Sequence, residues 1–296
     1  MKFTAQPTSF PVETLYAEDM TGEDASFSII APPLGAPMTP LVFASPHSGV
    51  LYPADMAPAG GLDDRSLRSA EDALVDRLVE AGPAHGAPLI AGRIGRAYVD
   101  LNRDPDELDP RLIAGIDGPA GPKTAAGYGV LPRLAGDGVP LYDRRLTPEE
   151  AERRLATAHR PYHAALAGLM ETAQARFGRA ILVDWHSMPR RAADADVVLG
   201  NRHGASCRGE ATRRLASLFE AEGWRVALNQ PYAGGWSTQR WGRPDEGFEA
   251  VQVELNRRLY FDEEARAPGA TFDAARRALT RVIAALCAGP WPAVRR

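Results

Sequence analysis

The sequence lacks most features that mark secreted, membrane-bound or nucleic-acid-binding proteins. Its 296 residues include only two cysteines, Cys207 and Cys287, without CxxC or metal-ligand spacing, and so few thiols are typical of a reducing cytoplasm. No apolar run reaches the 18 residues of a membrane span, and residues 1–16 lack the apolar core of a signal peptide. The net charge is −4 and no Lys/Arg cluster stands out, which argues against nucleic acid as a partner. We therefore expect a cytoplasmic protein, whose oligomeric state the sequence leaves open.

Several catalytic motifs are absent as well. There is no GxSxG motif and Cys207 has no partner pattern, which disfavours a serine or cysteine nucleophile. Neither a P-loop nor a complete GxGxxG opening a βα unit is present, which disfavours nucleotide binding.

The pattern of apolar residues predicts strands that alternate with helices. Strands are expected at 27–32, 40–45, 88–92, 97–101, 180–184, 195–201, 224–229 and 248–255, and helices at 66–82, 147–178, 207–222 and 270–288. Thr147, Pro148 and Glu150 form a helix start with a capping box, and Pro161 should kink or divide that helix. Such alternation predicts a mostly parallel sheet covered on both faces, here in one domain spanning 1–296. The Gly-, Pro- and Asp-rich stretch 103–145 is expected to be functional or mobile.

Polar residues gather where the predicted strands end. His47 and His186 each follow an apolar run, and in open α/β sheets ligands bind beyond the carboxyl ends of strands. Two imidazoles and one carboxylate suit a catalytic zinc ion with an open position for water. The acid would be Glu71 or Asp72, in the helix after the His47 loop, and the residues alone leave both open.

Other polar residues suggest roles around such a metal. Glu254 lies in an apolar strand and could serve as general base, or pair with Arg257. In "DLNRDP", Arg103 could bind a substrate carboxylate through paired hydrogen bonds, or pair internally with Asp100, Asp104 or Asp106. His159 and His163 are interpreted as packing residues or neighbours of the site, His203 could line the pocket, and Tyr232 is as readily core as site.

Eight segments between about residues 40 and 262 together resemble the N-formylglutamate amidohydrolase, or deformylase, family. In order they are "SPHSGVLYP", "EDALVDRL", "YVDLNRDP", "HRPYHAAL", "LVDWHSMP", "GNRHGASC", "YAGGWSTQRWG" and "VQVELNR". That family is similar to the zinc carboxypeptidase and aspartoacylase group. The resemblance implies a phosphorylase/hydrolase-like fold, a three-layer α/β/α sandwich with a mostly parallel mixed sheet.

The resemblance also implies a reaction and a set of site residues. One Zn²⁺ per chain would be bound by His47, Asp72 and His186, although Val50 stands where the wider group has the acid of an HxxE motif. Glu254 would be the general acid/base, and Arg96 would polarise the scissile carbonyl. The substrate would contact Asn102, Arg103, Gly235 and Thr238. The implied activity is hydrolysis of N-formyl-L-glutamate in histidine catabolism. The alternatives are a hydrolase of another N-acyl amino acid or small peptide, and a metal-free carboxylate-binding protein of the same fold.

Overall fold

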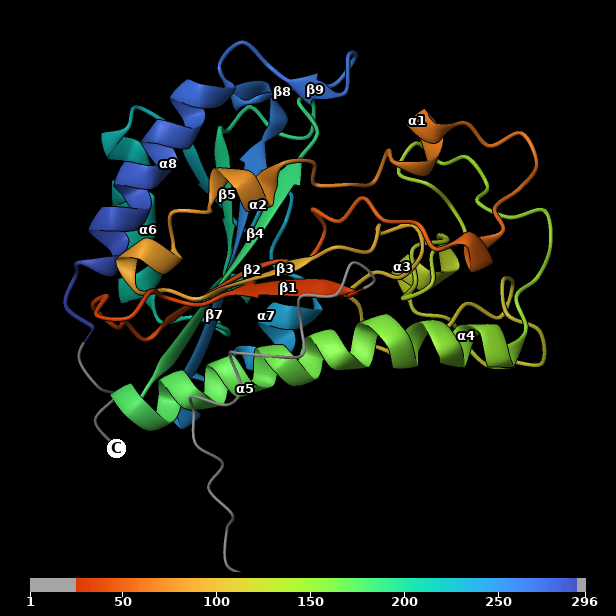
Figure 1. Ribbon diagram of the computed structural model, residues 1–296, viewed down its shortest axis with the longest axis horizontal. Coiled ribbons are helices and arrows are strands. Elements are labelled where there is room, and N and C mark those ends of the chain that lie inside the picture. Colours follow the sequence, from red (N-terminus) through yellow and green to blue (C-terminus); the bar gives the residue numbers. More distant parts are fainter. Residues whose placement is uncertain (1–24, 292–296) are drawn as a thin grey trace, which may run out of the picture.

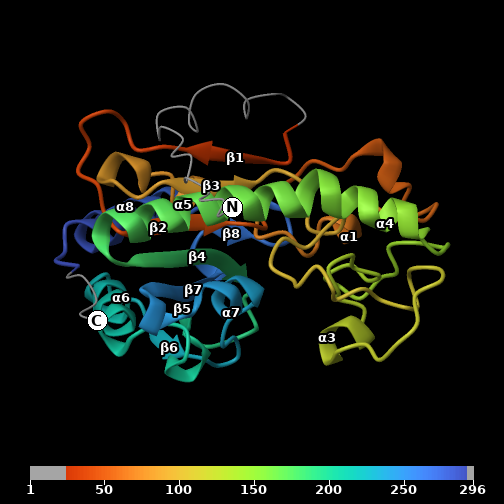
Figure 2. The ribbon, with the colours of Figure 1, turned by 90° about the horizontal axis from the view of Figure 1, so that it is seen from below.

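A seven-stranded mixed sheet forms the centre of the computed structural model, which describes residues 25–291 (Figure 1). The strand order, visible from top to bottom in Figure 2, is β1–β3–β2–β4–β7–β5–β6. β2, β3, β4 and β7 are parallel, β1 is antiparallel to β3, and β5 and β6 run together antiparallel to β7. The bounds are β1 Phe27–Ile30, β2 Leu41–Ser45, β3 Leu89–Gly92, β4 Ala180–Met188, β5 Val197–Gly200, β6 Val226–Leu228 and β7 Phe248–Asn256. The predicted α/β fold with a mostly parallel mixed sheet is confirmed.

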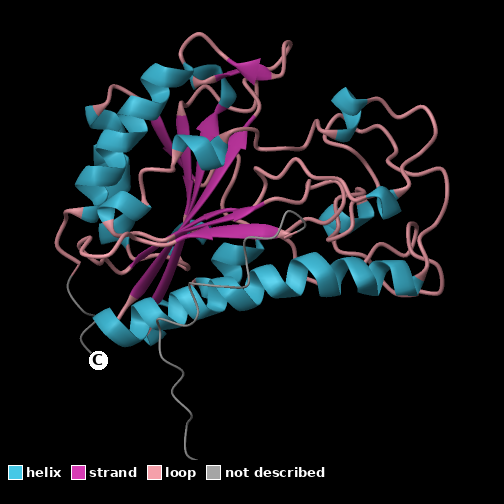
Figure 3. Cartoon of the chain, in the orientation of Figure 1, coloured by secondary structure: helices cyan, strands magenta, loops and turns pink. Residues whose placement is uncertain are grey.

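Helices cover both faces of the sheet because side chains alternate along each strand. In β2, Val42 and Ala44 pack in the cluster that contains α5 (Arg160–Phe177). The neighbouring Leu41 and Phe43 pack in the opposite cluster, with α2 (Val75–Leu78), α6 (Gly209–Ala221) and α8 (Phe272–Cys287). Figure 3 shows the helices on either side of the strands, and the cores on the two faces make the predicted three layers.

The helix predicted at 147–178 consists of three segments. α4 (Pro148–Arg154) starts with the predicted capping box, in which Thr147 accepts from the Glu150 N–H and Glu150 accepts from the Thr147 N–H. A π-helical turn, η4 (Leu155–His159), follows directly before α5, whose first turn contains Pro161. The helix is not divided at Pro161: a π-helical turn lies just before it, and the three segments run on as one rod (Figure 1).

The predictions for 66–82 and 97–101 are wrong. Residues 66–82 form only two short helices, α1 (Asp64–Leu67) and α2, because the Asp72 N–H donates to the His47 carbonyl (2.9 Å) instead of continuing a helix. Residues 97–101 form a turn, in which the Tyr98 N–H donates to the Gly95 carbonyl. Elsewhere β4 continues to Met188, and the expected loop 232–244 contains α7 (Trp236–Trp241).

The irregular stretch 103–145 is packed against the sheet layers rather than loose. Apolar side chains along it, including Ile113, Val130 and Leu141, belong to the same core cluster as α5. It contains only α3 (Pro122–Ala125) as a helix. Arg154 of α4 is fully buried beneath it, with Nη1 donating to the Tyr142 hydroxyl (2.7 Å) and Nη2 to the Met56 carbonyl (3.2 Å). These contacts hold the stretch in a fixed position beside the strand ends.

The remaining elements are short and lie at the edges of the layers. They are η2 Ala54–Met56, η3 Pro83–His85, η5 Arg202–Gly204, η6 Pro244–Glu246, η7 Arg257–Leu259, β8 Phe261–Asp262 and β9 Ala267–Pro268. Cys207 and Cys287 are buried and form no disulfide. None of the helices in the described range is long and apolar enough to cross a membrane. The prediction that the N-terminal residues carry no signal peptide concerns residues outside the described range.

Candidate metal centre and substrate cavity

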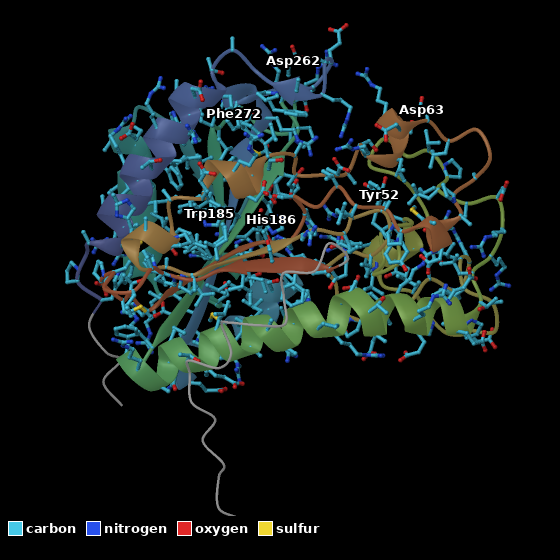
Figure 4. All side chains as sticks on the ribbon, in the orientation of Figure 1. Tyr52, Asp63, Trp185, His186, Asp262 and Phe272 are labelled. Atoms are coloured by element: carbon cyan, nitrogen blue, oxygen red, sulfur yellow. The ribbon has the colours of Figure 1, made fainter. Side chains whose placement is uncertain are left out.

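A cavity of about 460 Å³ opens at the carboxyl ends of β2, β4 and β7. Its floor contains His47, Asp72, His186 and Glu254, and its walls come from segments 96–136 and 231–235. His47 lies two residues beyond β2, whereas His186 and Glu254 stand opposite each other in the registered pair β4 and β7. Figure 4 shows His186 between Trp185 on the sheet and the irregular region that carries Tyr52.

Two histidines and an aspartate converge at the floor of this cavity. The ligand atoms of His47, Asp72 and His186 all lie within 4.8 Å of one another, and all three residues are buried. His47 Nδ1 is 3.1 Å from His186 Nδ1, and Asp72 Oδ2 is 3.3 Å from the former and 2.9 Å from the latter. Such a cluster could hold a metal ion.

The hydrogen bonds behind the two imidazoles determine which ring nitrogens face the cluster. His47 Nε2 lies 2.7 Å from Asp100 Oδ1, and His186 Nε2 lies 3.0 Å from Asp184 Oδ2. When each ring carries its proton on the Nε2 that faces these carboxylates, both Nδ1 atoms present lone pairs toward Asp72. Two imidazole lone pairs and a carboxylate oxygen within 3.3 Å repel one another unless a proton or a metal cation lies between them. The donor set, with carboxylates behind both histidines, therefore fits a zinc ion.

The charges around the cluster also favour a cation. Burial raises the pKa of the Asp72 carboxyl, but hydrogen bonds to His186 and His47 outweigh burial and hold this pKa well below its usual range. Burial lowers the pKa of His186, yet Asp184 and Asp72 raise it well above its ordinary value. With Asp100 and Asp184 behind the imidazoles, three carboxylates lie around the cluster and attract positive charge.

Glu71, the other acid left open by the sequence, is turned away from the histidines. Its carboxylate accepts from the Tyr52 hydroxyl (2.9 Å) and from Arg68 Nε (3.0 Å), with Arg266 Nη2 at 3.4 Å. In the loop between α1 and α2, Glu71 and Asp72 point to different neighbours. Only Asp72 reaches the histidine pair.

Glu254 is buried beside the cluster and does not pair with Arg257. Gln252 Nε2 donates to Glu254 Oε1 (2.6 Å), whereas Arg257 lies 3.6 Å from Asp72 and 3.8 Å from Glu263. Burial, and then repulsion from Asp72, raises the pKa of Glu254, although His186 opposes the shift. A carboxyl whose pKa is raised toward neutrality can accept and return a proton.

Arg96 and Arg103 line the cavity on either side of Asp100. Arg96 Nε donates to Asp100 Oδ2 (2.9 Å), and this carboxylate keeps the pKa of Arg96 raised although burial alone would lower it. Arg103 Nε donates to the Tyr128 carbonyl (2.9 Å) and lies 3.9 Å from both Asp100 and Glu107. Neither Asp104 nor Asp106 is among the ion-pair partners of Arg103 in the described structure.

Asn102, Gly235 and Thr238 form the frame of the cavity. Asn102 Nδ2 donates to Asp184 Oδ2 (3.2 Å), and Asn102 Oδ1 accepts from the Ser237 N–H (2.8 Å). A Cβ atom on Gly235 would lie 2.5 Å from Asn102 Nδ2. Thr238 is fully buried with its hydroxyl bonded to the Gly235 carbonyl (2.7 Å), and it lies outside the cavity lining, unlike Asn102 and Gly235.

Known proteins resemble this chain over most of its length. A model of the N-formylglutamate amidohydrolase family matches residues 39–261. The chain belongs to that family. An N-formylglutamate deformylase of Pseudomonas aeruginosa is 34% identical over 236 residues, which are 76% of this chain and 84% of that protein. A second, of Pseudomonas putida, is 32% identical over 233 residues, covering 76% of this chain and 82% of that protein.

Solved structures share the fold of this family member. The crystal structure of N-formylglutamate amidohydrolase from Ralstonia eutropha JMP134 superposes with a TM-score of 0.84 at 36% identity, covering 89% of this chain and 97% of that one. A protein of Agrobacterium tumefaciens has a TM-score of 0.62 at 16% identity, covering 87% of this chain and 94% of that one, and so shares the fold.

In this N-formylglutamate amidohydrolase family member, several residues in or behind the cavity were not singled out from sequence. Asp184 precedes His186 by two residues in β4, and the period of two that puts both on one face was a usable signal. Asp100 was placed at a strand end, but its only suggested role was as a partner of Arg103. Gln252 and Lys123 also line the cavity, and no local pattern in the sequence marks them.

The other histidines have different surroundings. His159 Nε2 lies 3.0 Å from the Arg103 carbonyl and His163 Nε2 lies 2.8 Å from the Leu101 carbonyl, so both brace the backbone on either side of Asn102. Burial lowers the pKa of both imidazoles, which keeps them neutral. His203 is exposed and does not line the cavity, so that prediction is wrong, whereas Tyr232 does line it.

Proposed function

We propose that this protein hydrolyses the N-formyl amide of N-formyl-L-glutamate, giving L-glutamate and formate, with one zinc ion per chain bound by His47, Asp72 and His186. The observation that carries the proposal is the convergence of two imidazole nitrogens and a carboxylate oxygen beside Glu254, on the floor of a cavity with arginine in its walls. Family membership and the names of the Pseudomonas relatives support the choice of substrate. The unpaired, buried cysteines support a cytoplasmic location.

Glu254 is the proposed general acid/base. When bound, zinc would supply a Lewis acid that lowers the pKa of a water molecule and polarises a carbonyl group. Glu254 accepts the proton of the attacking water on its carboxylate. It then returns this proton to the amine nitrogen as the C–N bond breaks, and its raised pKa suits both steps.

In this proposal Arg96 and Arg103 bind two different groups of the substrate. Arg96, fixed through its Nε by Asp100, donates to the formyl oxygen as negative charge develops there. Arg103, fixed through its Nε by the Tyr128 carbonyl, binds the α-carboxylate of the substrate. Asn102, Gly235 and Thr238 keep the frame in place, since the polar groups of Asn102 and Thr238 already have protein partners.

The test is hydrolysis of a panel of N-formyl and N-acetyl amino acids, with and without a chelator, together with the zinc content of the purified protein. We expect about one zinc per chain, as for a tetrahedral three-ligand site, preference for N-formyl-L-glutamate, and loss of turnover on chelation. Turnover that survives removal of all metal would contradict the metal assignment. Preference for another N-acyl amino acid would revise the proposed substrate. A zinc-free protein that binds carboxylates without hydrolysing them would refute the proposed enzymatic activity.

A further inference from the structure

Lysine is almost absent from this chain, and one of its two lysines lines the substrate cavity. Of 34 lysine and arginine residues only Lys2 and Lys123 are lysine. Lys123 lies in α3 and belongs to the cavity wall. Within residues 25–291 it forms no ion pair, it is exposed to solvent, and the carboxylates of Asp100 and Glu107 lie 3.9 Å from Arg103. Its ammonium group is therefore available to a ligand.

The charges in the cavity favour an anion near Lys123. The lining contains four cationic side chains, Arg96, Arg103, Lys123 and Arg257, and three carboxylates, Asp72, Asp100 and Glu254. Burial, and then repulsion from Arg103, lowers the pKa of Lys123. A carboxylate beside both would remove this repulsion.

Backbone hydrogen bonds fix the position of Lys123 relative to Arg103. The Lys123 carbonyl accepts from the Tyr128 N–H (2.9 Å), and the Tyr128 carbonyl accepts from Arg103 Nε (2.9 Å). The Thr124 side chain beside Lys123 is fully buried, which anchors α3 in the wall. These bonds connect the backbone of Lys123 to the Arg103 side chain through Tyr128, although the two residues are 20 apart in the chain.

We propose that Lys123 binds the side-chain carboxylate of the substrate and thereby selects acidic over neutral N-acyl amino acids. This inference rests on the proposed function, in which Arg103 binds the α-carboxylate. The planar fork of arginine suits a carboxylate at a fixed backbone position, whereas the compact lysine charge with three donors suits a carboxylate on a flexible side chain.

The first test compares N-formyl-L-glutamate with its neutral isostere N-formyl-L-glutamine in wild type and Lys123→Met. Loss of a charged hydrogen-bond partner should lower kcat/KM for the acid by roughly 10- to 100-fold, mostly through KM, and leave the isostere within about twofold. The control is Arg111→Met, which removes an exposed positive charge of the same segment outside the cavity. It should leave both substrates unchanged.

If Lys123→Met left the ratio of kcat/KM for N-formyl-L-glutamate to that for N-formyl-L-glutamine unchanged, the proposed role of Lys123 would be overturned. Wild-type protein that hydrolyses no N-formyl-L-glutamate would instead refute the proposed function, so the two failures can be told apart.

A second test does not depend on turnover of the isostere. Brief acetylation of the zinc-loaded wild-type protein, quantified by peptide mass spectrometry, measures the reactivity of Lys123, with Lys2 as reference for the reagent. N-formyl-L-glutamate at ten times its KM should slow acetylation of Lys123 roughly tenfold, since about nine-tenths of the sites are then filled. N-formyl-L-glutamine at the same concentration should protect less. Equal acetylation of Lys123 with and without N-formyl-L-glutamate would overturn the inference.

Discussion

Glu254 illustrates how one side chain depends on its strand for its chemistry. β7 delivers it opposite His186, where burial raises its pKa. Glu254→Gln keeps the shape but cannot accept a proton, so we expect kcat to fall about 100-fold or more while zinc content is retained. Steady-state kinetics and metal analysis measure both.

The matched control for this variant is Glu249→Gln, the same substitution at the other end of β7. Glu249 is buried against Arg179 and accepts from the Arg208 N–H (2.8 Å), away from the cavity. This control should lower the unfolding temperature and leave kcat intact. If Glu254→Gln lost stability but kept kcat, Glu254 would be a structural residue.

At the scale of elements, the segment 231–235 and Asn102 form a close contact that leaves no space for a side chain. In Gly235→Ala the new methyl group would displace the Asn102 amide, which bonds to Asp184 behind His186. A displacement of about 1 Å at a site can cost roughly 100-fold in rate, and we expect a loss of kcat/KM of that order.

Gly168→Ala is the control, because a Cβ there meets nothing within 4 Å. On α5 it should raise the free energy of unfolding by about 0.5–1 kcal/mol, as Ala does relative to Gly in helices, with unchanged kinetics. Full activity in Gly235→Ala would show that the Asn102 contact does not position the site.

Local signals predicted those elements whose sequence pattern spans only a few neighbouring residues. The capping box at Thr147 and the alternation in β7 depend on neighbours a few residues away, and both were found from sequence. The helix predicted at 66–82 failed because distant partners take its backbone groups. The Asp72 N–H donates to the His47 carbonyl, and the Glu71 carbonyl accepts from Arg257 Nη2 (2.6 Å), 186 residues away. The spacing of apolar residues within 66–82 gives no information about such distant contacts.

At the scale of the whole molecule, a bound metal should stabilise the fold. His47, Asp72 and His186 come from three distant segments, so an ion that binds only the folded chain adds its binding energy to folding. At 100 times its Kd this is about 2.7 kcal/mol, or roughly 5–10 °C in Tm for a chain of this size. Thermal unfolding with zinc and with chelator measures the difference.

The variants Asp72→Asn and Glu71→Gln separate the two neighbouring acids. Zinc should no longer raise the Tm of Asp72→Asn, because the third ligand is weakened. Glu71→Gln should unfold at a lower temperature, through its bonds to Tyr52 and Arg68, yet keep the full zinc-dependent rise. The opposite pattern would move the metal ligand to Glu71.

Prediction of the whole architecture succeeded in fold class, whereas the sequence offered no prediction of the strand order. Alternating strands and helices implied a covered, mostly parallel sheet, but which strands are neighbours depends on packing among distant segments. Likewise, the residues at strand ends could be proposed as a site, whereas Lys123 reaches the cavity only through the folded stretch 103–145. That residues 1–296 form one domain stays a prediction.

The π-helical turn η4 has a consequence for tolerance to insertion and deletion. A π-helical turn contains one residue more than an α-helical turn, and each residue rotates a helix by about 100°. Losing one residue between Leu155 and His159 would restore a regular helix and rotate α4 by that angle relative to α5. Arg154 would then leave Tyr142 and Met56, while His163 kept its place beside Leu101. We therefore expect this rod to tolerate single substitutions better than a deletion or insertion, which would rotate every side chain of α4 relative to α5.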